Sequence, residues 1–270
     1  FSATRKLPTW AARPFKDSEA SEGESPQAVV FADCFNRYFE PENLRATLKV
    51  MEAADVPVHL AKAPKGERPL CCGRTFLSAG LIDEAKVEAQ RLVDALMPYV
   101  EQGLPIIGLE PSCLLTLRDE IPALLPGEDT SKLAAKARML EEYIADQEAN
   151  PDFHLPLTSP APKVLLHGHC HQKAMGIMSS IEKTLALLPN TQVETVETSC
   201  CGMAGAFGYG TDTHETSRAM AELDLAPAIR KADTETLIVA DGTSCRHQVA
   251  DLTTRQPVHM ARLLEMALKK

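Results

Sequence analysis

The chain has 270 residues, of which 44% are hydrophobic and 24% are charged. This length and composition allow a buried core in one large domain or in two domains of ordinary size. The formal net charge is −9 and no run of Lys and Arg exceeds two residues, which excludes a nucleic-acid partner. The sequence contains no apolar stretch of about 18 residues and no secretory leader pattern, so it predicts a cytoplasmic protein without a transmembrane segment.

The first half of the chain alternates short strands with helices. It begins with Phe1 rather than Met, as a piece of a longer protein does, and residues 1–27 are interpreted as a linker segment. The run AVVFAD (28–33) is short, apolar and β-branched, which predicts a buried strand ending at Cys34. In chain order, the pattern then predicts a helix (42–54), a strand (56–61), a helix (82–100), a strand (105–109) leading to Cys113, and a helix (131–147).

The second half repeats this order. Residues 151–162 contain four prolines and no helical period, so they are predicted to link a first repeat (28–150) to a second repeat (163–270). The predicted elements are a strand (163–167) leading to Cys170, a helix (179–188), a strand (191–196) leading to Cys200, a helix (215–229), and a strand (236–240) leading to Cys245. This alternation predicts an α/β fold of two repeated βαβ-type halves with parallel sheets. Ligands of such sheets bind at the carboxyl ends of the strands, where these cysteines are expected to gather.

All eight cysteines belong to two copies of one pattern, a lone Cys, a Cys-Cys-Gly triplet and a second lone Cys. The first copy consists of Cys34, Cys71, Cys72 and Cys113, and the second of Cys170, Cys200, Cys201 and Cys245. Four thiolates from three separated segments are what a tetrahedral metal ion or an iron–sulfur cluster requires. The sequence therefore predicts a duplicated metal-binding unit whose function is electron transfer.

Two alternatives to an iron–sulfur protein are compatible with the cysteine pattern. The adjacent cysteines can form a strained vicinal disulfide for thiol–disulfide exchange without a metal, but this does not explain the lone cysteines. Four thiolates also suit a closed zinc site, which predicts a zinc-stabilised structural or docking module. One half can also hold iron and the other zinc.

Histidines distinguish the two copies. The second copy has His167, His169 and His171 around Cys170, and His247 two residues beyond Cys245, whereas the first copy has no histidine near its cysteines. His169, His171 and His247 are candidates for binding or protonating a substrate, or for hydrogen-bonding a cluster. A metal and histidine substrate site in the second repeat is therefore a further alternative.

Glycines and acidic residues accompany the cysteines. Gly73, Gly202 and Gly205 are expected to let the backbone approach a cluster, because a side chain there would collide with it. Glu110 and Asp241, which lie just before strand-end cysteines, are interpreted as helix caps or solvated turn residues rather than catalytic groups.

The repeated pattern resembles the cysteine-rich (CCG) domain found in the cysteine-rich subunit of heterodisulfide reductase, in the iron–sulfur subunit of glycolate oxidase and in one subunit of the anaerobic glycerol-3-phosphate dehydrogenase. The stretches HGHCHQKA (167–174), SCCGMAGAFGY (199–209) and DGTSCRHQ (241–248) are more similar still to the C-terminal part of FAD-linked, iron–sulfur D-2-hydroxyacid dehydrogenases of the D-lactate or D-2-hydroxyglutarate type. The heterodisulfide reductase domain has a fifth cysteine in each repeat, and Thr116 and Gln248 occupy those places here. A five-cysteine cluster is therefore not expected.

The resemblance implies an electron-transfer domain with one or two [4Fe–4S] clusters, held by the cysteines. FAD then belongs to a partner oxidase domain or subunit, and the electrons pass to a quinone, a flavoprotein or a cytochrome. Such a domain is not expected to be active alone, and it can lie peripherally on the inner face of the membrane.

Overall fold

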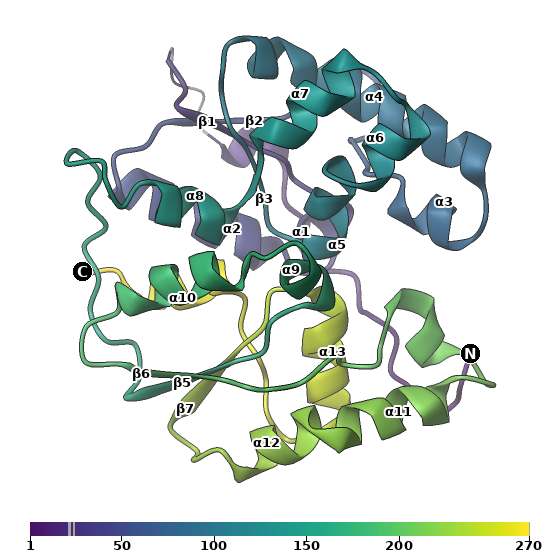
Figure 1. The fold of residues 1–270 in the computed structure, drawn as a ribbon, viewed down its shortest axis with the longest axis vertical. Helices are drawn as coiled ribbons and strands as arrows, with labels where there is room; N and C mark the ends of the chain where they lie inside the picture. Colours follow the sequence, from purple (N-terminus) through teal and green to yellow (C-terminus); the bar gives the residue numbers. More distant parts are fainter. Residues whose placement is uncertain (21–22, 24, 270) are drawn as a thin grey trace. The chain divides into compact units, whose positions relative to one another are not determined.

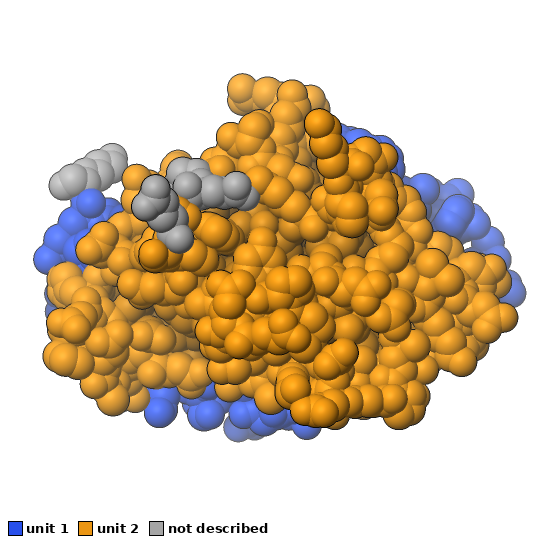
Figure 2. All heavy atoms as spheres, turned by 90° about the horizontal axis from the view of Figure 1, so that it is seen from above, with its two compact units in different colours: residues 1–10, 156–270 blue, residues 11–155 orange. Residues whose placement is uncertain are grey.

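The computed structural model describes residues 1–20, 23 and 25–269, and it divides the chain into two compact units. Residues 11–155, orange in Figure 2, form the first-copy unit, which contains the first copy of the cysteine pattern. Residues 1–10 and 156–270, blue in Figure 2, form the second-copy unit. Each unit therefore has one complete set of four cysteines.

Over its described residues, the first-copy unit contains a parallel sheet with the strand order β2-β1-β3-β4. Figure 1 labels β1, β2 and β3 of this sheet. The strands are β1 (Ala28–Val30), β2 (Val58–Leu60), β3 (Ile106–Gly108) and β4 (Ala137–Met139). Val30 pairs with Leu60 on one side and with Ile107 on the other, so β1 is a central strand. All residues of β1 and β3 are buried, which explains why both strands are short runs without polar residues.

Helices connect these strands and cover their apolar side chains. They are α1 (Cys34–Tyr38), α2 (Pro41–Ala53), α3 (Arg74–Ser78), α4 (Ile82–Glu101), α5 (Pro111–Leu114), α6 (Glu120–Leu124), α7 (Glu128–Lys136) and α8 (Leu140–Asp146), with 3-10 turns η1 (Asp17–Glu19) and η2 (Leu115–Leu117). Pro41 is the first residue of α2, where the missing N–H has no helical partner. Leu92 and Leu96 lie on the buried face of α4, as the helical period predicts.

The second-copy unit has a parallel sheet with the strand order β6-β5-β7 over the residues described there. Its strands are β5 (Lys163–Leu166), β6 (Gln192–Thr195) and β7 (Thr236–Val239). Val258 extends this sheet, because its N–H donates to Ile238 O at 2.8 Å and its carbonyl accepts from Ala240 N at 3.0 Å. Val258 thus lies beside β7 as β4 lies beside β3, and the duplication includes this fourth position.

The helices of the second-copy unit are α9 (Cys170–Ala174), α10 (Met178–Ala186), α11 (His214–Leu223), α12 (Leu225–Lys231), α13 (Thr243–Leu252) and α14 (Met260–Ala267), with the 3-10 turn η3 (Gly205–Tyr209). The prediction of an α/β fold built from two repeated halves with parallel sheets is confirmed. In the described part of the chain, no helix has both the length and the apolar composition needed to cross a bilayer.

The prediction of one helix over 131–147 is wrong. The helical path ends at Lys136, the next three residues form β4, and α8 begins at Leu140. Tertiary contacts hold this strand, since β4 pairs along β3 and Arg118 Nε donates to Ala137 O at 3.0 Å. Glu142 then accepts from Met139 N at 2.9 Å and so caps the start of α8.

The prediction of one helix over 215–229 is also wrong, because the chain breaks at Asp224 between α11 and α12. Pro227 explains the break. A proline ring collides with the carbonyl group four residues earlier, which here belongs to Leu223, the last residue of α11.

Candidate metal centres

In each unit, the cysteines follow the carboxyl ends of three parallel strands. Cys34 follows β1, the Cys71-Cys72 pair follows β2, and Cys113 follows β3; Cys170 follows β5, the Cys200-Cys201 pair follows β6, and Cys245 follows β7. Parallel strands bring their carboxyl ends to one edge of the sheet, so three segments distant in sequence meet there. All eight cysteines are free thiols.

Equivalent cysteines have the same burial in both copies. Cys72, Cys113, Cys201 and Cys245 are buried, whereas Cys34, Cys71, Cys170 and Cys200 are partly exposed. Cys201 and Cys245 pack in a hydrophobic cluster with Met203, Leu225 and Ile229. Each set therefore has two thiols within the core and two toward the surface of its unit.

The thiols of the first copy contact one another. Cys71 is hydrogen-bonded with Cys34 and Cys72, and Cys72 with Cys113. These bonds, assisted by the Gly73 N–H, lower the pKa of Cys71, while the pKa values of Cys34 and Cys72 are raised by the same contacts and by burial. These contacts thus favour the thiolate form at Cys71 and the thiol form at Cys34 and Cys72.

The second copy repeats this chain of contacts. Cys200 is hydrogen-bonded with Cys170 and Cys201, and Cys201 with Cys245. Hydrogen bonds with Cys170 and Cys201 lower the pKa of Cys200, which also accepts from Gly202 N at 3.3 Å. Both copies therefore place a backbone N–H of the triplet glycine on the first sulfur of the adjacent pair.

The last cysteine of each set differs in its electrostatic surroundings. A hydrogen bond with Cys72 lowers the pKa of Cys113, but burial and the nearby carboxylates Asp33 and Glu110 raise it to about 12. The pKa of Cys245 is instead well below its usual value because of a hydrogen bond with Cys201 and the neighbouring imidazoles of His167 and His169. The first centre has acidic neighbours and the second has histidines.

Asp33 and His169 occupy equivalent places, one residue before the first cysteine of each set. Asp33 Oδ1 accepts from Phe35 N and Asn36 N, both at 3.0 Å, and caps α1. His169 Nδ1 accepts from His171 N at 3.2 Å and caps α9 in the same way. Glu110 caps α5 by accepting from Ser112 N, as the sequence predicts.

Asp241 is buried, at 1% exposure, so of its two interpretations, a helix cap or a solvated turn residue, the second is wrong. Its Oδ2 accepts from Gln172 Nε2 at 2.9 Å, and its Oδ1 accepts from Met260 N at 2.9 Å. Gln172 Oε1 in turn accepts from His169 N at 2.9 Å. This network fixes the turn that presents Cys170, because each buried polar group in it has a defined partner.

A second buried network supports Cys201. Gln248 Nε2 donates to Cys201 O at 2.8 Å, and Gln248 Oε1 accepts from Arg5 Nη1 at 2.8 Å. Arg5 also donates to Asp251 at 2.6 Å and to Ser217 at 3.0 Å. The place of a fifth cysteine is therefore taken by a residue engaged in structural hydrogen bonds.

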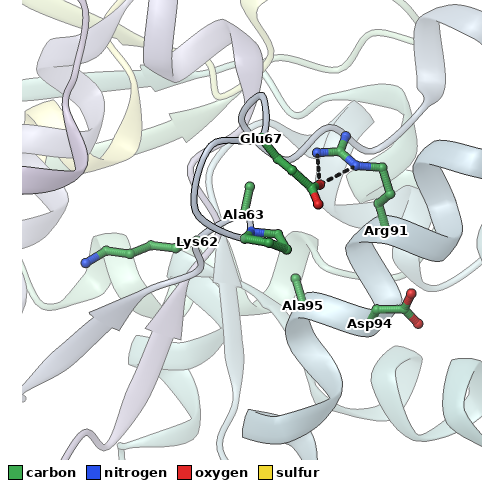
Figure 3. A pocket seen from close by; sticks show the side chains of 7 residues that line it. Lys62, Ala63, Glu67, Arg91, Asp94 and Ala95 are labelled. Atoms are coloured by element: carbon green, nitrogen blue, oxygen red, sulfur yellow. Dashed lines mark hydrogen bonds and ion pairs between the residues drawn. The ribbon is translucent and has the colours of Figure 1, made fainter.

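Ion pairs fasten the loop that presents Cys71 to α4. A cavity of about 320 Å³ opens beside this loop, lined by Lys62, Ala63, Pro64, Glu67, Arg91, Asp94 and Ala95 (Figure 3). Glu67 and Arg91 form an ion pair at its rim, with Glu67 Oε2 3.4 Å from Arg91 Nη2. Arg91 also donates to Arg68 O at 2.8 Å and to Glu88 at 2.9 Å, and Arg68 pairs with Glu88. These charges serve to anchor the loop.

Gly73 and Gly202 both have a left-handed backbone, with φ of +78° and +83°. A Cβ on Gly202 would lie 2.3 Å from Ser217 O in α11, and one on Gly73 would lie 3.1 Å from Ala85 O in α4. A helix thus occupies the space that a side chain would need at these two glycines, and their approach to a cluster stays a prediction. Gly205 has a φ of +60° with no atom within 4 Å of its added Cβ among the described residues.

Three histidines predicted as candidates have different surroundings. The rings of His169 and His171 are edge-to-face with centroids 5.0 Å apart, and His169 Nδ1 lies 3.9 Å from Cys170 Sγ. His247 Nδ1 lies 3.2 Å from the Tyr209 hydroxyl. Their catalytic role stays a prediction.

The structure places His167 against the thiols, and sequence reasoning missed this role. One ring nitrogen of His167 and the sulfurs of Cys201 and Cys245 all lie within 4.8 Å of one another, and all three residues are buried. Within the described chain, neither ring nitrogen of His167 has a nitrogen or oxygen hydrogen-bond partner, and the Cys245 thiol is a polar neighbour of the ring. The donor set fits a metal or an iron–sulfur centre, because thiolate sulfur and imidazole nitrogen are ligands that such centres bind.

Comparisons with known proteins identify the family of this chain. The cysteine-rich domain family, CCG, matches residues 28–118 and 164–250. One subunit of the anaerobic glycerol-3-phosphate dehydrogenase of Escherichia coli (strain K12) is 28% identical over 90% of this chain and 59% of its own length. The D-2-hydroxyglutarate dehydrogenase of Pseudomonas putida is 30% identical over 86% of this chain and 21% of its own length. Lactate utilization protein A of Bacillus velezensis is 25% identical over 78% of this chain and 86% of its own length.

These matches include two of the proteins that the sequence motifs resemble, the subunit of anaerobic glycerol-3-phosphate dehydrogenase and D-2-hydroxyglutarate dehydrogenase. The chain spans about three fifths of the first relative and about one fifth of the second. Both matched family segments contain one complete cysteine set, in agreement with the duplication that the two sheets show.

Proposed function

We propose, from the premise that this chain belongs to the cysteine-rich domain (CCG) family, that it is the iron–sulfur electron-transfer module of a flavin-dependent dehydrogenase. Its two cysteine sets each hold one centre, with Cys34, Cys71, Cys72 and Cys113 as the ligands of the first and Cys170, Cys200, Cys201 and Cys245 as the ligands of the second. The centres supply one-electron redox chemistry when bound.

The observation that carries this proposal is the meeting of four thiols at one sheet edge in each unit. The repeats proposed over residues 28–150 and 163–270 each contain one matched family segment. Two of the four thiols in each set are partly exposed, so an electron can enter or leave near the surface of the unit. Buried partners keep the other side of each centre dry, which protects it from solvent.

The relatives support a dehydrogenase partner. Glycerol 3-phosphate, D-2-hydroxyglutarate and lactate, which their names contain, all bear a secondary alcohol and an acidic group, a phosphate in the first and a carboxylate next to the alcohol in the other two. Oxidation of that alcohol delivers two electrons and a proton to a flavin, and the flavin releases the electrons one at a time. We assign this chain to an enzyme for a D-2-hydroxyacid of the D-lactate or D-2-hydroxyglutarate type, with FAD in a separate domain or subunit and a quinone, flavoprotein or cytochrome as acceptor.

Metal and acid-labile sulfide analysis on protein purified without oxygen, with EPR spectra before and after dithionite, tests the proposal. We expect iron with sulfide and a reducible signal, and the ratio of iron to protein gives the number of centres. Zinc without sulfide would contradict the relay function.

A zinc-stabilised docking module is the second candidate. The grouping of His167, Cys201 and Cys245 within 4.8 Å favours it, because the ligands of one tetrahedral ion lie roughly 3.5 Å apart. This function predicts a colourless protein that unfolds when a chelator removes the metal, and retention of the fold without metal would exclude it.

The contact of the His169 and His171 rings beside Cys170 favours a third candidate, a substrate site at the second centre. Exchange of His171 for Asn should then lower the turnover of the assembled enzyme without loss of metal. Unchanged turnover would remove this candidate.

A further inference from the structure

The two copies differ at one buried position that has the same backbone in both. Phe31 and His167 each lie three residues before the first cysteine of their set. The N–H of Phe31 donates to Ile107 O at 2.8 Å, and the N–H of His167 donates to Val239 O at 2.8 Å. The main chain therefore presents these two side chains from equivalent places, and only their chemistry differs.

A fully buried position of this kind suits phenylalanine better than histidine. Phe31 is 0% exposed and His167 is 1% exposed. Burial of a polar group without a hydrogen bond destabilises a folded protein, and in the part of the chain that the structure describes neither imidazole nitrogen has a nitrogen or oxygen partner. A phenyl ring at this place has no such cost, so an imidazole here requires a compensating ligand.

That compensation is available at the second cysteine set. One ring nitrogen of His167 and the sulfurs of Cys201 and Cys245 lie within 4.8 Å of one another. Imidazole and thiolate together bind zinc and iron, and an uncharged nitrogen ligand adds no further negative charge to a buried thiolate site.

We propose that His167 is a ligand of the second metal centre, which is then held by mixed nitrogen and sulfur donors, whereas the first centre has sulfur donors alone. The inference rests on the proposed function only in assuming that the second cysteine set binds metal. The second set then has five candidate donors, the four cysteines and His167. His167 lies directly after the end of β5, whereas the fifth cysteine of the related domain would lie at the position of Gln248. The two centres are therefore different in kind, although the fold that holds them is duplicated.

X-ray absorption spectroscopy at the iron edge tests this ligand directly, because imidazole gives a characteristic outer-shell scattering that thiolate does not give. The sample is the full 270-residue chain reconstituted without oxygen with ferrous iron and sulfide. We expect imidazole scattering in the unchanged protein and its loss in His167→Phe, which copies the residue of the first set. His154→Phe, the same exchange at an exposed histidine, should keep the scattering.

Two further measurements keep the test decisive if His167→Phe folds poorly. His167→Cys supplies a sulfur donor at the same place, and it should retain iron but lose the imidazole scattering. Iron in the second centre of His167→Phe should exchange to a chelator roughly tenfold faster or more.

Each outcome has a distinct meaning. Iron bound with sulfur scattering alone, or imidazole scattering that survives in both His167 variants, would overturn the ligand assignment and leave the relay function standing. A chain that binds neither iron nor sulfide would overturn both.

Discussion

Cys201 is buried in an apolar cluster and is also in contact with two other thiols. It packs in the hydrophobic cluster of the second-copy unit at 4% exposure, and its thiol is hydrogen-bonded between Cys200 and Cys245. Those neighbours and burial raise its pKa, so the site holds protons where a cation would otherwise bind. Cys72 has the same place in the first set.

The conservative exchange Cys201→Ser should therefore remove the second centre. A serine hydroxyl does not provide the thiolate that the centre needs, and we expect loss of its visible absorbance and of electron delivery to the acceptor, while flavin reduction in the assembled enzyme continues. Absorbance and stopped-flow flavin reduction measure the two effects. Cys72→Ser is the matched variant in the first set, and loss of flavin reduction in either variant would contradict a pure relay.

The glycine after each cysteine pair acts through the backbone. Gly202 needs a left-handed conformation, and the carbonyl of Ser217 fills the space where a side chain would begin. Gly205 has a left-handed conformation too, but open space surrounds its missing Cβ within the described structure. The two positions separate backbone strain from steric collision.

We expect Gly202→Ala to lower the free energy of unfolding by about 3 kcal/mol or more, since strain and displacement of α11 add. Gly205→Ala should cost about 1 kcal/mol, from strain alone. Denaturant unfolding of the metal-free proteins gives both values. Equal effects at the two positions would show that collision with Ser217 is not what Gly202 avoids.

At the scale of elements, the segment of residues 1–10 belongs with the second cysteine set, although it is distant in sequence. Ser2 N donates to Tyr209 O at 2.8 Å, and the guanidinium of Arg5 is buried between Ser217, Gln248 and Asp251. Through Gln248, this segment supports the backbone that presents Cys201.

Arg5→Ala should accordingly destabilise the protein by about 3 kcal/mol, because it leaves the buried partners of Arg5 unpaired. It should also accelerate loss of metal from the second centre, since Gln248 loses its anchor. Arg13→Ala, at an exposed arginine, is the control. Chelator competition and thermal unfolding measure the effects, and metal loss confined to the first centre would contradict the network.

Patterns in the sequence predicted most elements and failed for two helices, of which a neighbouring strand overrode only one. Residues 137–139 have the composition of a helix, but they pair with the edge of β3 and form a strand of the sheet. The break before Pro227, by contrast, follows from the local geometry of proline and was available in the sequence.

For the whole molecule, the duplication conceals a difference in charge. Asp33 and Glu110 stand near the first set, whereas His167 and His169 stand near the second. Negative charge near a redox centre disfavours addition of an electron, and a histidine ligand raises the potential of an iron–sulfur centre. We therefore expect the second centre to have the more positive midpoint potential and to be reduced first.

An EPR-monitored redox titration tests this order within the proposed function. The centre left in Cys72→Ser, which is the second, should have the more positive midpoint potential, and the centre left in Cys201→Ser the more negative one. Asp33→Asn, which keeps an N-cap but removes the charge, should raise the potential of the first centre. The reverse order of midpoints would refute the charge argument.

The sequence by itself determined the α/β class, the duplication and the grouping of the cysteines, because hydrophobic period and the rule that parallel strands end at one edge are local or general properties. Only the tertiary structure decided that His167 rather than His247 faces the thiols, that Asp241 is buried, and that Arg5 supports Cys201. Comparison of Phe31 with His167 in the two copies is a sequence signal that could have found this histidine. The other contacts join segments distant in the chain, and their partners depend on how the folded backbone brings side chains together.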